Sequence, residues 1–211
     1  MFLATAAASL AAERPAGSTS KNISFAVREG DGFRKSNLSA YEGKIVVIMM
    51  MTPWCPICQS HASAVGDGLL DYFYAASRNK LRGKNARGIP IENILLSTEE
   101  AAQWDPVNTS FSAKNGFRRW GLDANPERSS PRTLLGYFRG GFINSSNLYD
   151  WGDDRRRLVV INLVRNSPTH SYREIIINRN TFSSRDFARA RAAINAVKPA
   201  PAAFPASFKR Y

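Results

Sequence analysis

Residues 45–58 read IVVIMMMTPWCPIC, and this stretch decides the fold. Its first half, residues 45–51, is a continuous apolar run, as expected of a strand that is buried on both faces. Pro56 suits the first turn of a helix, because proline lacks the N–H that would be unpaired there anyway. The two cysteines of the chain, Cys55 and Cys58, therefore lie at a strand-to-helix junction, one helical turn apart. Such a pair can close and reopen a small disulfide, a two-electron switch that needs neither a metal nor a cofactor.

The rest of the chain predicts an α/β fold with a mixed central sheet flanked by helices. Alternating and continuous apolar patterns predict strands at 23–27, 33–38, 45–51, 89–96, 158–164 and 172–178, and helices at 56–78, 97–120 and 183–197. The first two strands form an N-terminal hairpin, and the last two strands form a second hairpin before the final helix. Gly66 and Gly68 weaken the first helix and are expected to bend it.

The 211 residues suit one domain, which we place at residues 23–198. A hydrophobic fraction of 44% is enough for a sizeable core. Residues 121–152, rich in Gly, Asn, Ser and aromatics, follow no regular period and form an insertion before the last hairpin. Residues 13–22 are interpreted as a linker, and residues 199–211 as a flexible tail.

Residues 1–12 look like the apolar and cleavage regions of a secretory signal, although the apolar stretch from residue 2 has no Lys or Arg before it. The stretch is too short to span a membrane, which takes about 20 apolar residues. No later stretch is long and apolar enough either, so we expect no integral membrane span. The mature protein is therefore predicted to be exported, to the periplasm or another extracytoplasmic compartment.

The chain is strongly basic, with a formal net charge of +12. Its basic residues are scattered, and the densest groups are 155–157 and the helix-like set Arg185, Arg189 and Arg191. No aromatic-interleaved motif accompanies them, so we expect no nucleic-acid partner. The charge suits docking to a negatively charged protein.

The position of each cysteine predicts its role. The attacking species in thiol–disulfide exchange is a thiolate, and the N-terminus of a helix favours negative charge. Cys55 is therefore predicted to be the exposed nucleophile, and Cys58 the more buried thiol that resolves the mixed disulfide. Trp54 supplies a flat apolar surface beside them, and Pro56 and Ile57 complete the expected substrate-binding residues.

These features resemble the thioredoxin superfamily, and most closely the exported TlpA/ResA-type thiol–disulfide oxidoreductases with a redoxin domain. The resemblance is carried by residues 32–38, 41–47, 54–58 and 158–197. It implies a thioredoxin-like fold, reduction of disulfides in exported client proteins, an upstream thiol donor and no bound cofactor. The family also places a cis-proline just before the strand at 158–164, where this chain has Arg156 or Arg157. That departure bears on how a client would dock.

Other interpretations of the cysteine pair have less support in the sequence. A stable structural disulfide is an alternative in an exported protein. A metal site of Cys55, Cys58 and His61 lacks an evident fourth ligand, so we expect no metal. Gln59 stands where haem attachment would need a histidine. His61 is an ordinary polar helix residue in the simplest interpretation, and a residue that tunes Cys58 in the other.

A peroxiredoxin-like thiol peroxidase is the second candidate enzyme. Thr52 lies three residues before Cys55, as that family's threonine precedes its peroxidatic cysteine, and Arg156 occurs where the family has an arginine. A hydroxyl and a guanidinium could bind peroxide and stabilise the thiolate. Ile48 stands where the family has proline, which argues against this hypothesis.

A third hypothesis is a non-catalytic binding module, in which the 121–152 insertion recruits a partner and the disulfide is structural. Its candidate contacts are the aromatic side chains of that insertion, Tyr137, Phe138, Phe142, Tyr149 and Trp151. A local hydrophobic cluster under a long loop explains the same residues and is the preferred interpretation.

Overall fold

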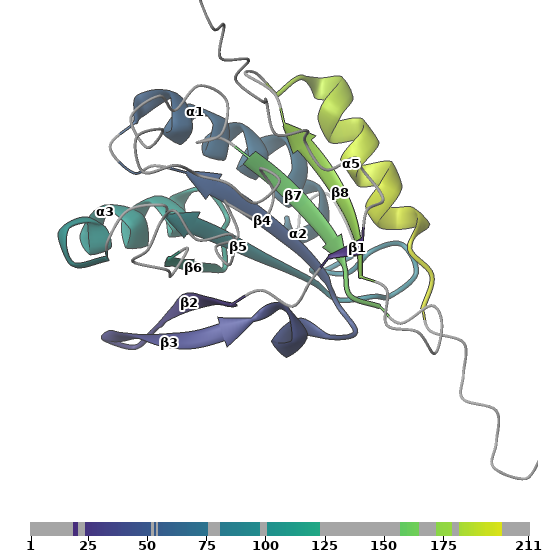
Figure 1. Cartoon of the computed structure of the whole chain (residues 1–211). Coiled ribbons are helices and arrows are strands. Elements are labelled where there is room, and N and C mark those ends of the chain that lie inside the picture. The colour runs from purple at the N-terminus through teal and green to yellow at the C-terminus, as the bar shows by residue number, and fades with distance from the viewer. Residues whose placement is uncertain are drawn as a thin grey trace, which may run out of the picture.

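Strand β4 (Ile45–Met51) lies at the centre of the sheet in the computed structural model (Figure 1). The structure describes residues 19–20, 24–51, 53, 55–75, 81–97, 101–122, 157–164, 172–178 and 182–199. β4 pairs with β5 (Ile91–Ser97) in parallel and with β7 (Arg157–Asn162) in antiparallel orientation. All seven residues of β4 are buried, as the apolar run predicted.

The sheet extends on both sides of these three strands. On one side are β8 (Tyr172–Asn178) and the two-residue β1 (Thr19–Ser20). On the other side are β6 (Arg119–Leu122) and the N-terminal hairpin of β2 (Ser24–Glu29) and β3 (Gly32–Asn37). The order among the described strands is β1-β8-β7-β4-β5-β6-β2-β3. The hairpin therefore joins the sheet through β6.

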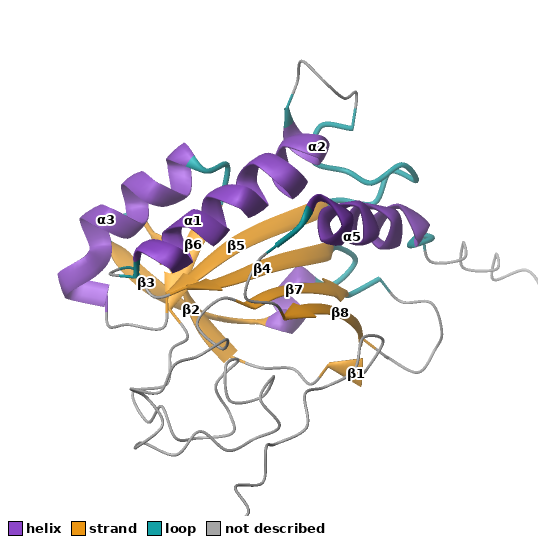
Figure 2. Cartoon of the chain, turned by 90° about the horizontal axis from the view of Figure 1, so that it is seen from above, coloured by secondary structure: helices purple, strands orange, loops and turns teal. Residues whose placement is uncertain are grey.

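The helices α1 (Pro56–Val65), α3 (Ala101–Lys114) and α5 (Ser184–Ala196) lie along the same face of the sheet (Figure 2). The one-turn elements are a 3-10 helix (Leu38–Tyr41), a π-helical turn η2 (Gly66–Leu70) and α2 (Asp71–Tyr74). α5 begins with a capping box, in which the Ser183 hydroxyl accepts from the Asp186 N–H and the Asp186 carboxylate accepts from the Ser183 N–H. This cap explains why the final helix starts where the sequence predicted.

Each face of β4 contributes to a different hydrophobic core. Ile45, Val47 and Met49 face α1, α2 and α5, with Phe73 and Phe187 among their neighbours in the core. The alternate side chains of β4 face a second core on the opposite side of the sheet, which includes Phe25, Val27, Leu38 and Tyr41 from the N-terminal segment. Burial on both faces is what a strand without polar alternation requires.

The first predicted helix is not uniform and ends earlier than expected. The prediction ran from 56 to 78, whereas the helical region passes through the π-turn η2 and ends at Tyr74. Ala75 has extended backbone angles (φ −65°, ψ 113°). At Gly68, an added Cβ would lie 2.3 Å from the ring of Phe187, so a side chain here would force that ring or α5 to shift. The predicted bend is therefore a site of close packing.

The second predicted helix was also drawn too long. It was expected to reach about residue 120, but α3 ends at Lys114 and residues 119–122 form strand β6. Gly116 adopts φ +75°, a left-handed conformation that ends a helix. Trp120 lies in the strand, with its ring 5.1 Å from that of Phe33 in an edge-to-face arrangement. The predicted insertion thus loses its first two residues to the sheet, and residues 123–152 lie outside the described residues.

The predicted linker at 13–22 contains part of the sheet. Thr19 pairs with Arg173, and Ser20 pairs with Tyr172. A two-residue pairing leaves no pattern in a sequence, which is why composition alone suggested a linker. The predicted signal segment and most of the predicted tail lie outside the described residues. Within the described part of the chain, no helix is long and apolar enough to cross a membrane.

Candidate functional site

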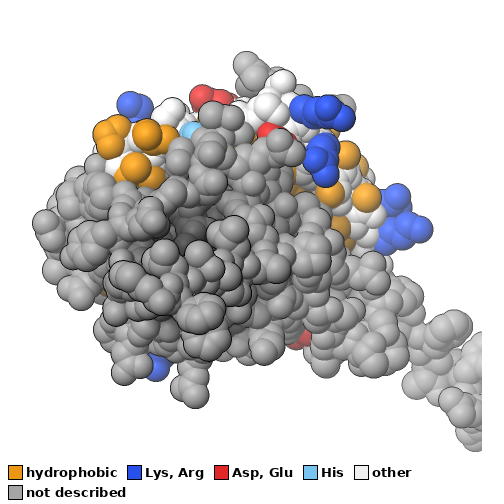
Figure 3. Space-filling model, turned by 45° about the horizontal axis from the view of Figure 1, so that its top comes forward, with side chains coloured by type: hydrophobic (Ala, Val, Ile, Leu, Met, Phe, Trp, Pro, Cys, Tyr) orange, Lys and Arg blue, Asp and Glu red, His pale blue; other side chains and the backbone are white. Residues whose placement is uncertain are grey.

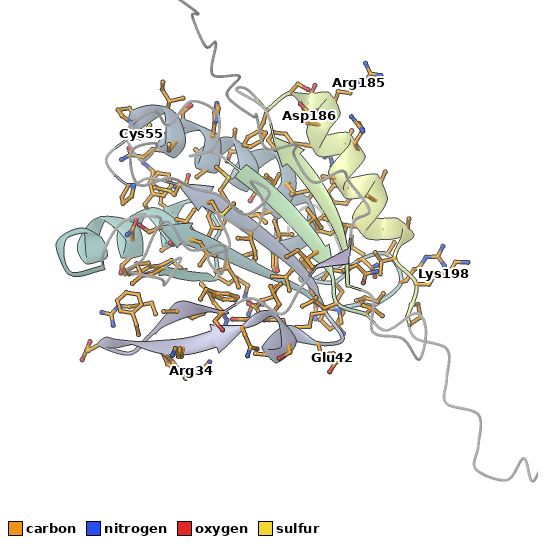
Figure 4. The ribbon with its side chains drawn as sticks, viewed as in Figure 1. Arg34, Glu42, Cys55, Arg185, Asp186 and Lys198 are labelled. Carbon is orange, nitrogen blue, oxygen red and sulfur yellow. The ribbon has the colours of Figure 1, made fainter. Side chains whose placement is uncertain are left out.

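Cys55 occupies the N-cap of α1, immediately beyond the end of the central strand (Figure 4). Its backbone is extended (φ −93°, ψ 110°), Pro56 is the first residue of the helix, and the Gln59 N–H donates to the Cys55 carbonyl at 3.0 Å. The buried Pro53 lies between strand and helix. This strand-to-helix junction places the sulfur-bearing residue at the positive end of the helix dipole, as predicted.

The two cysteines differ in exposure. Cys55 is half-buried, whereas Cys58, one turn further along α1, is 0% exposed and packs in the core against the sheet. Both are thiols, and no disulfide joins them in the structure. A reagent in solution can reach the first thiol, whereas the second is shielded from solvent.

The surface beside Cys55 is apolar. Pro56 is exposed, and Ile57 is 56% exposed, the one large hydrophobic side chain with such exposure among the described residues. Figure 3 shows hydrophobic side chains on the surface over this end of α1. An isoleucine left in water next to a thiol offers contact area to an apolar segment of another molecule. The neighbouring Trp54 and Thr52 lie outside the described residues.

Gln59 holds the junction together. Its side-chain amide donates to the Pro53 carbonyl, so α1 is tied back to the turn that precedes Cys55. Sequence reasoning used Gln59 only to exclude haem attachment and missed this contact. Its signal was the position itself, since a long amide side chain in the first turn of a helix can reach the backbone before the N-cap.

His61 lies on the buried side of α1, three residues after Cys58, and is 8% exposed. Its ring centroid is 5.1 Å from that of Phe182, which in turn is 5.9 Å from Phe187 at the start of α5. The helical spacing puts Cys58 and His61 on the same side of the helix. This contact between α1 and the segment just before α5 was not predicted, because Phe182 is remote in sequence.

The start of β7 reaches the same end of the sheet. Arg157, its first residue, pairs with Met50 of β4. Arg156 itself, the predicted peroxide-binding arginine and one of the two residues at the expected cis-proline position, lies outside the described residues. Among the residues that the structure describes, no three His, Cys, Asp or Glu side chains are grouped to hold a metal ion.

A scan against protein-family models finds no match, and a search of curated proteins finds none either. Solved structures are similar at low identity. A candidate protein disulfide isomerase from Bacteroides thetaiotaomicron is 16% identical over 87% of this chain and 89% of its own, with a TM-score of 0.50. A thiol:disulfide interchange protein of the thioredoxin family from Chlorobium tepidum is 20% identical over 88% and 100%, with a TM-score of 0.44.

A yeast mitochondrial 1-Cys peroxiredoxin is 17% identical over 87% of this chain and 76% of its own, with a TM-score of 0.48. At these identities the likeness concerns the backbone and not the chemistry. The mixed sheet, the helix that begins at the cysteine pair and the closing hairpin and helix agree with the expectation drawn from the sequence. The chain therefore has a thioredoxin-like α/β fold, similar to that of the candidate protein disulfide isomerase.

Proposed function

We propose that this chain is a thiol–disulfide oxidoreductase that uses Cys55 and Cys58 as a redox pair. One observation supports it above the others: Cys55 is half-buried at the N-cap of α1, while Cys58 is fully buried one turn behind it. A structural disulfide needs no such difference in access, whereas an attacking and a resolving thiol do.

In the first step, the Cys55 thiolate attacks one sulfur of a client disulfide. The client S–S bond breaks, a mixed disulfide forms between Cys55 and the client, and the second client sulfur leaves as a thiolate that takes up a proton. The free N–H groups of the first turn of α1 and the helix dipole favour the negative sulfur before attack.

In the second step, Cys58 loses its proton and attacks the Cys55 sulfur. The mixed disulfide breaks, Cys55 and Cys58 become a disulfide, and the client leaves with two thiols, having gained two electrons. His61, on the same side of α1 as Cys58, is the proposed tuning residue for this buried thiol. An upstream thiol donor then returns the pair to the reduced state.

The client is proposed to dock on the apolar surface beside Cys55. Ile57 and Pro56 provide exposed area there, and Trp54 is the third proposed contact. The clients are proposed to be exported proteins, reduced in an extracytoplasmic compartment, as the TlpA/ResA-type resemblance implies.

Trapping the mixed disulfide tests the proposal. Cys58→Ser should accumulate a covalent adduct with an oxidised client, because the second step is lost. Adducts are measured by non-reducing electrophoresis and mass spectrometry, with Cys55→Ser as the matched control that cannot form them. Equal trapping by both variants, or none by either, would exclude the assigned roles.

The reduction potential of the pair tests the direction of transfer. Equilibration in glutathione or dithiothreitol buffers should give about −250 mV for a reductase, whereas about −120 mV would mark an oxidant that donates disulfides. A pair that stays oxidised in buffers well below about −300 mV would be a structural disulfide, and the redox proposal would be wrong.

A thiol peroxidase is the second candidate. The observation in its favour is the register of β7, whose first residue pairs with Met50, because Arg156 directly precedes that strand. If this function holds, Cys58→Ser should keep the first reaction with hydrogen peroxide, and Thr52→Val or Arg156→Leu should slow it. An unchanged peroxide rate in both variants would exclude the peroxidase.

A further inference from the structure

A basic surface runs along α5 and onto the loop before β5. We call it the basic face. It consists of side chains that are exposed or, for Arg191, half-buried: Arg82, Lys84, Arg87, Arg185, Arg189, Arg191 and Lys198. Figure 3 shows Lys and Arg side chains on the surface over α5. Within the described part of the chain, none of the seven forms an ion pair.

Hydrogen bonds make the two parts of this surface one rigid unit. The buried Asn85 amide donates to the carbonyls of Ile194 at 2.9 Å and Val197 at 3.0 Å. The Asn195 side chain accepts from the Ala86 N–H at 2.9 Å. The basic residues of the loop are therefore held beside the C-terminal end of α5.

Acidic side chains do not neutralise the basic face from within. Its elements, residues 81–97 and 182–199, contain two acidic residues, and both are buried. Glu92 pairs with Lys44 and Arg119, and Asp186 belongs to the cap of α5. The adjoining helical segment exposes Asp67 and Asp71, so the local excess of positive charge is still large.

The N-terminal end of the basic face lies at the redox end of the molecule. β8 runs parallel to β4, since each is antiparallel to β7, and α5 therefore begins at the same edge of the sheet as α1. Phe182 contacts His61 of α1 only three residues before Arg185. Figure 4 shows Cys55 and Arg185 at the same end of the ribbon.

We propose that the basic face recruits acidic protein partners, so that the redox pair reacts preferentially with clients whose disulfide is flanked by Asp and Glu. This rests on the proposed oxidoreductase function. A protein partner fits better than a membrane, because the exposed residues beside the α5 arginines are Ser184, Ala188 and Ala192, with no large apolar side chain to insert. It fits better than nucleic acid, because the described residues of the basic face include no exposed aromatic side chain for base stacking, and the half-buried Tyr72 is already covered by Arg191 at 5.0 Å.

Charge of this kind acts mainly on the rate of encounter. Complementary charges raise association rates about tenfold or more, and the gain falls as salt is added. The screening length is about 30 Å at an ionic strength of 0.01 M and about 8 Å at 0.15 M. A 13-residue helix is about 20 Å long, so its charges act together only in dilute salt.

The test compares three disulfide substrates by stopped-flow. Two are peptides with the same disulfide loop, one flanked by glutamates and the other by lysines, and the third is the neutral probe hydroxyethyl disulfide. The full chain in its dithiol form should reduce the acidic peptide at least about tenfold faster than the basic one at 0.01 M ionic strength. The ratio should approach one at 0.15 M and above.

Two matched variants locate the effect. Arg185→Glu with Arg189→Glu should abolish or reverse the preference while leaving the rate with hydroxyethyl disulfide unchanged. Lys35→Glu with Lys114→Glu makes the same change of net charge elsewhere on exposed positions and should keep most of the preference. If both variants lost the preference for the acidic peptide equally, net charge and not the basic face would determine that preference.

The outcomes separate this inference from the function on which it rests. Reaction with hydroxyethyl disulfide, but with no preference between the peptides, overturns the inference alone. Phosphatidylglycerol vesicles or duplex DNA that bind the chain through Arg185 and Arg189, without any peptide preference, would assign the basic face to another partner and also overturn it. Failure to reduce any of the three substrates overturns the redox function, and the inference with it.

Discussion

The two ends of the central strands are built in opposite ways. Beyond the carboxyl end of β4, Cys55 is half-buried and Ile57 is left in water. At the amino end of β5, the loop before the strand is fastened by Asn85, which is 1% exposed. Its side-chain NH2 group donates two hydrogen bonds, and its side-chain oxygen accepts two more. One end leaves a thiol and an apolar side chain accessible to solvent, and the other satisfies its polar groups internally.

This difference separates reactivity from stability. The buried contacts lie in β4, in the packed helices and in the fastened loop, so we expect that the cysteine end can expose a thiol and an apolar side chain at small cost in stability. Functional sites tolerate such local sacrifices when the remainder of the fold compensates for them. Four substitutions test this difference between the two ends of the sheet.

The largest effect is expected at the reactive end. Cys55→Ala should abolish reduction of hydroxyethyl disulfide and of peptide disulfides, because the attacking sulfur is gone. The free energy of unfolding of the reduced chain should change by less than about 1 kcal/mol, since the side chain is only half-buried. Activity is followed by thiol release, and stability by urea unfolding. Retention of activity by Cys55→Ala would show that Cys55 is not the attacking thiol.

At the fastened end, Asn85→Ala should lower stability by about 3 kcal/mol, because it leaves the buried Ile89 N–H without its partner and removes both hydrogen bonds from this side chain to the end of α5. The rate of disulfide reduction at 25 °C should stay unchanged. Asn115→Ala is the control: it removes a single local hydrogen bond to the Phe111 carbonyl and should cost about 1 kcal/mol. If the two variants lost equal amounts of unfolding free energy in urea, the hydrogen bonds of Asn85 would contribute no more than one local hydrogen bond.

Between the two ends, Gly68→Ala should cost about 1.5 kcal/mol, because the new Cβ meets the buried ring of Phe187. Gly32→Ala is the matched control, since nothing lies within 4 Å of the added Cβ and its backbone is not left-handed. That control should change the stability by no more than about 0.5 kcal/mol. A cost of similar size in both variants would contradict the tight contact between η2 and α5.

The smallest effect concerns Tyr74 at the fastened end. Its hydroxyl donates to the Ile91 carbonyl at 2.6 Å, and burial raises the pKa of this tyrosine well above its usual range. The folded state therefore keeps the proton that the unfolded chain releases above about pH 10, so stability falls as the pH rises beyond that value.

Tyr74→Phe should cost about 1 kcal/mol at neutral pH and make the alkaline loss of stability shallower. Burial also raises the pKa of Tyr41, so part of the slope should remain in this variant. The measurement is the urea midpoint between pH 8 and 11.5. A slope identical to that of the unmodified chain would show that Tyr74 titrates normally.

Local patterns were enough to predict the sheet centre and the position of the cysteine pair. The apolar run of β4 predicts a strand that is covered on both faces. The prolines around Cys55 mark the change from strand to helix. The start of α5 was predictable because Ser183 and Asp186 have the spacing of a cap. The different burial of Cys55 and Cys58 followed from their one-turn separation.

What sequence reasoning missed depends on contacts between distant segments. The π-turn at Gly66–Leu70 includes Gly68, which lies close to Phe187, a residue more than a hundred positions later. β6 has only four residues, and its place in the sheet is seen in its pairing with β2 and β5, which no local sequence pattern announces. The Phe182 contact with His61 has the same origin.

The attachment of the N-terminal hairpin through β6 has a consequence for the order of folding. β2 is made early in synthesis, but its partners Gly121 and Leu122 are made much later. Until they emerge, β2 can pair only with β3, although Val46, Ile48, Ile94 and Leu96 of the core that covers Phe25 and Val27 are already made. The β2–β6 pairing joins segments nearly a hundred positions apart, so we expect it to form after the local β2–β3 hairpin and to be the slower step in completing the sheet.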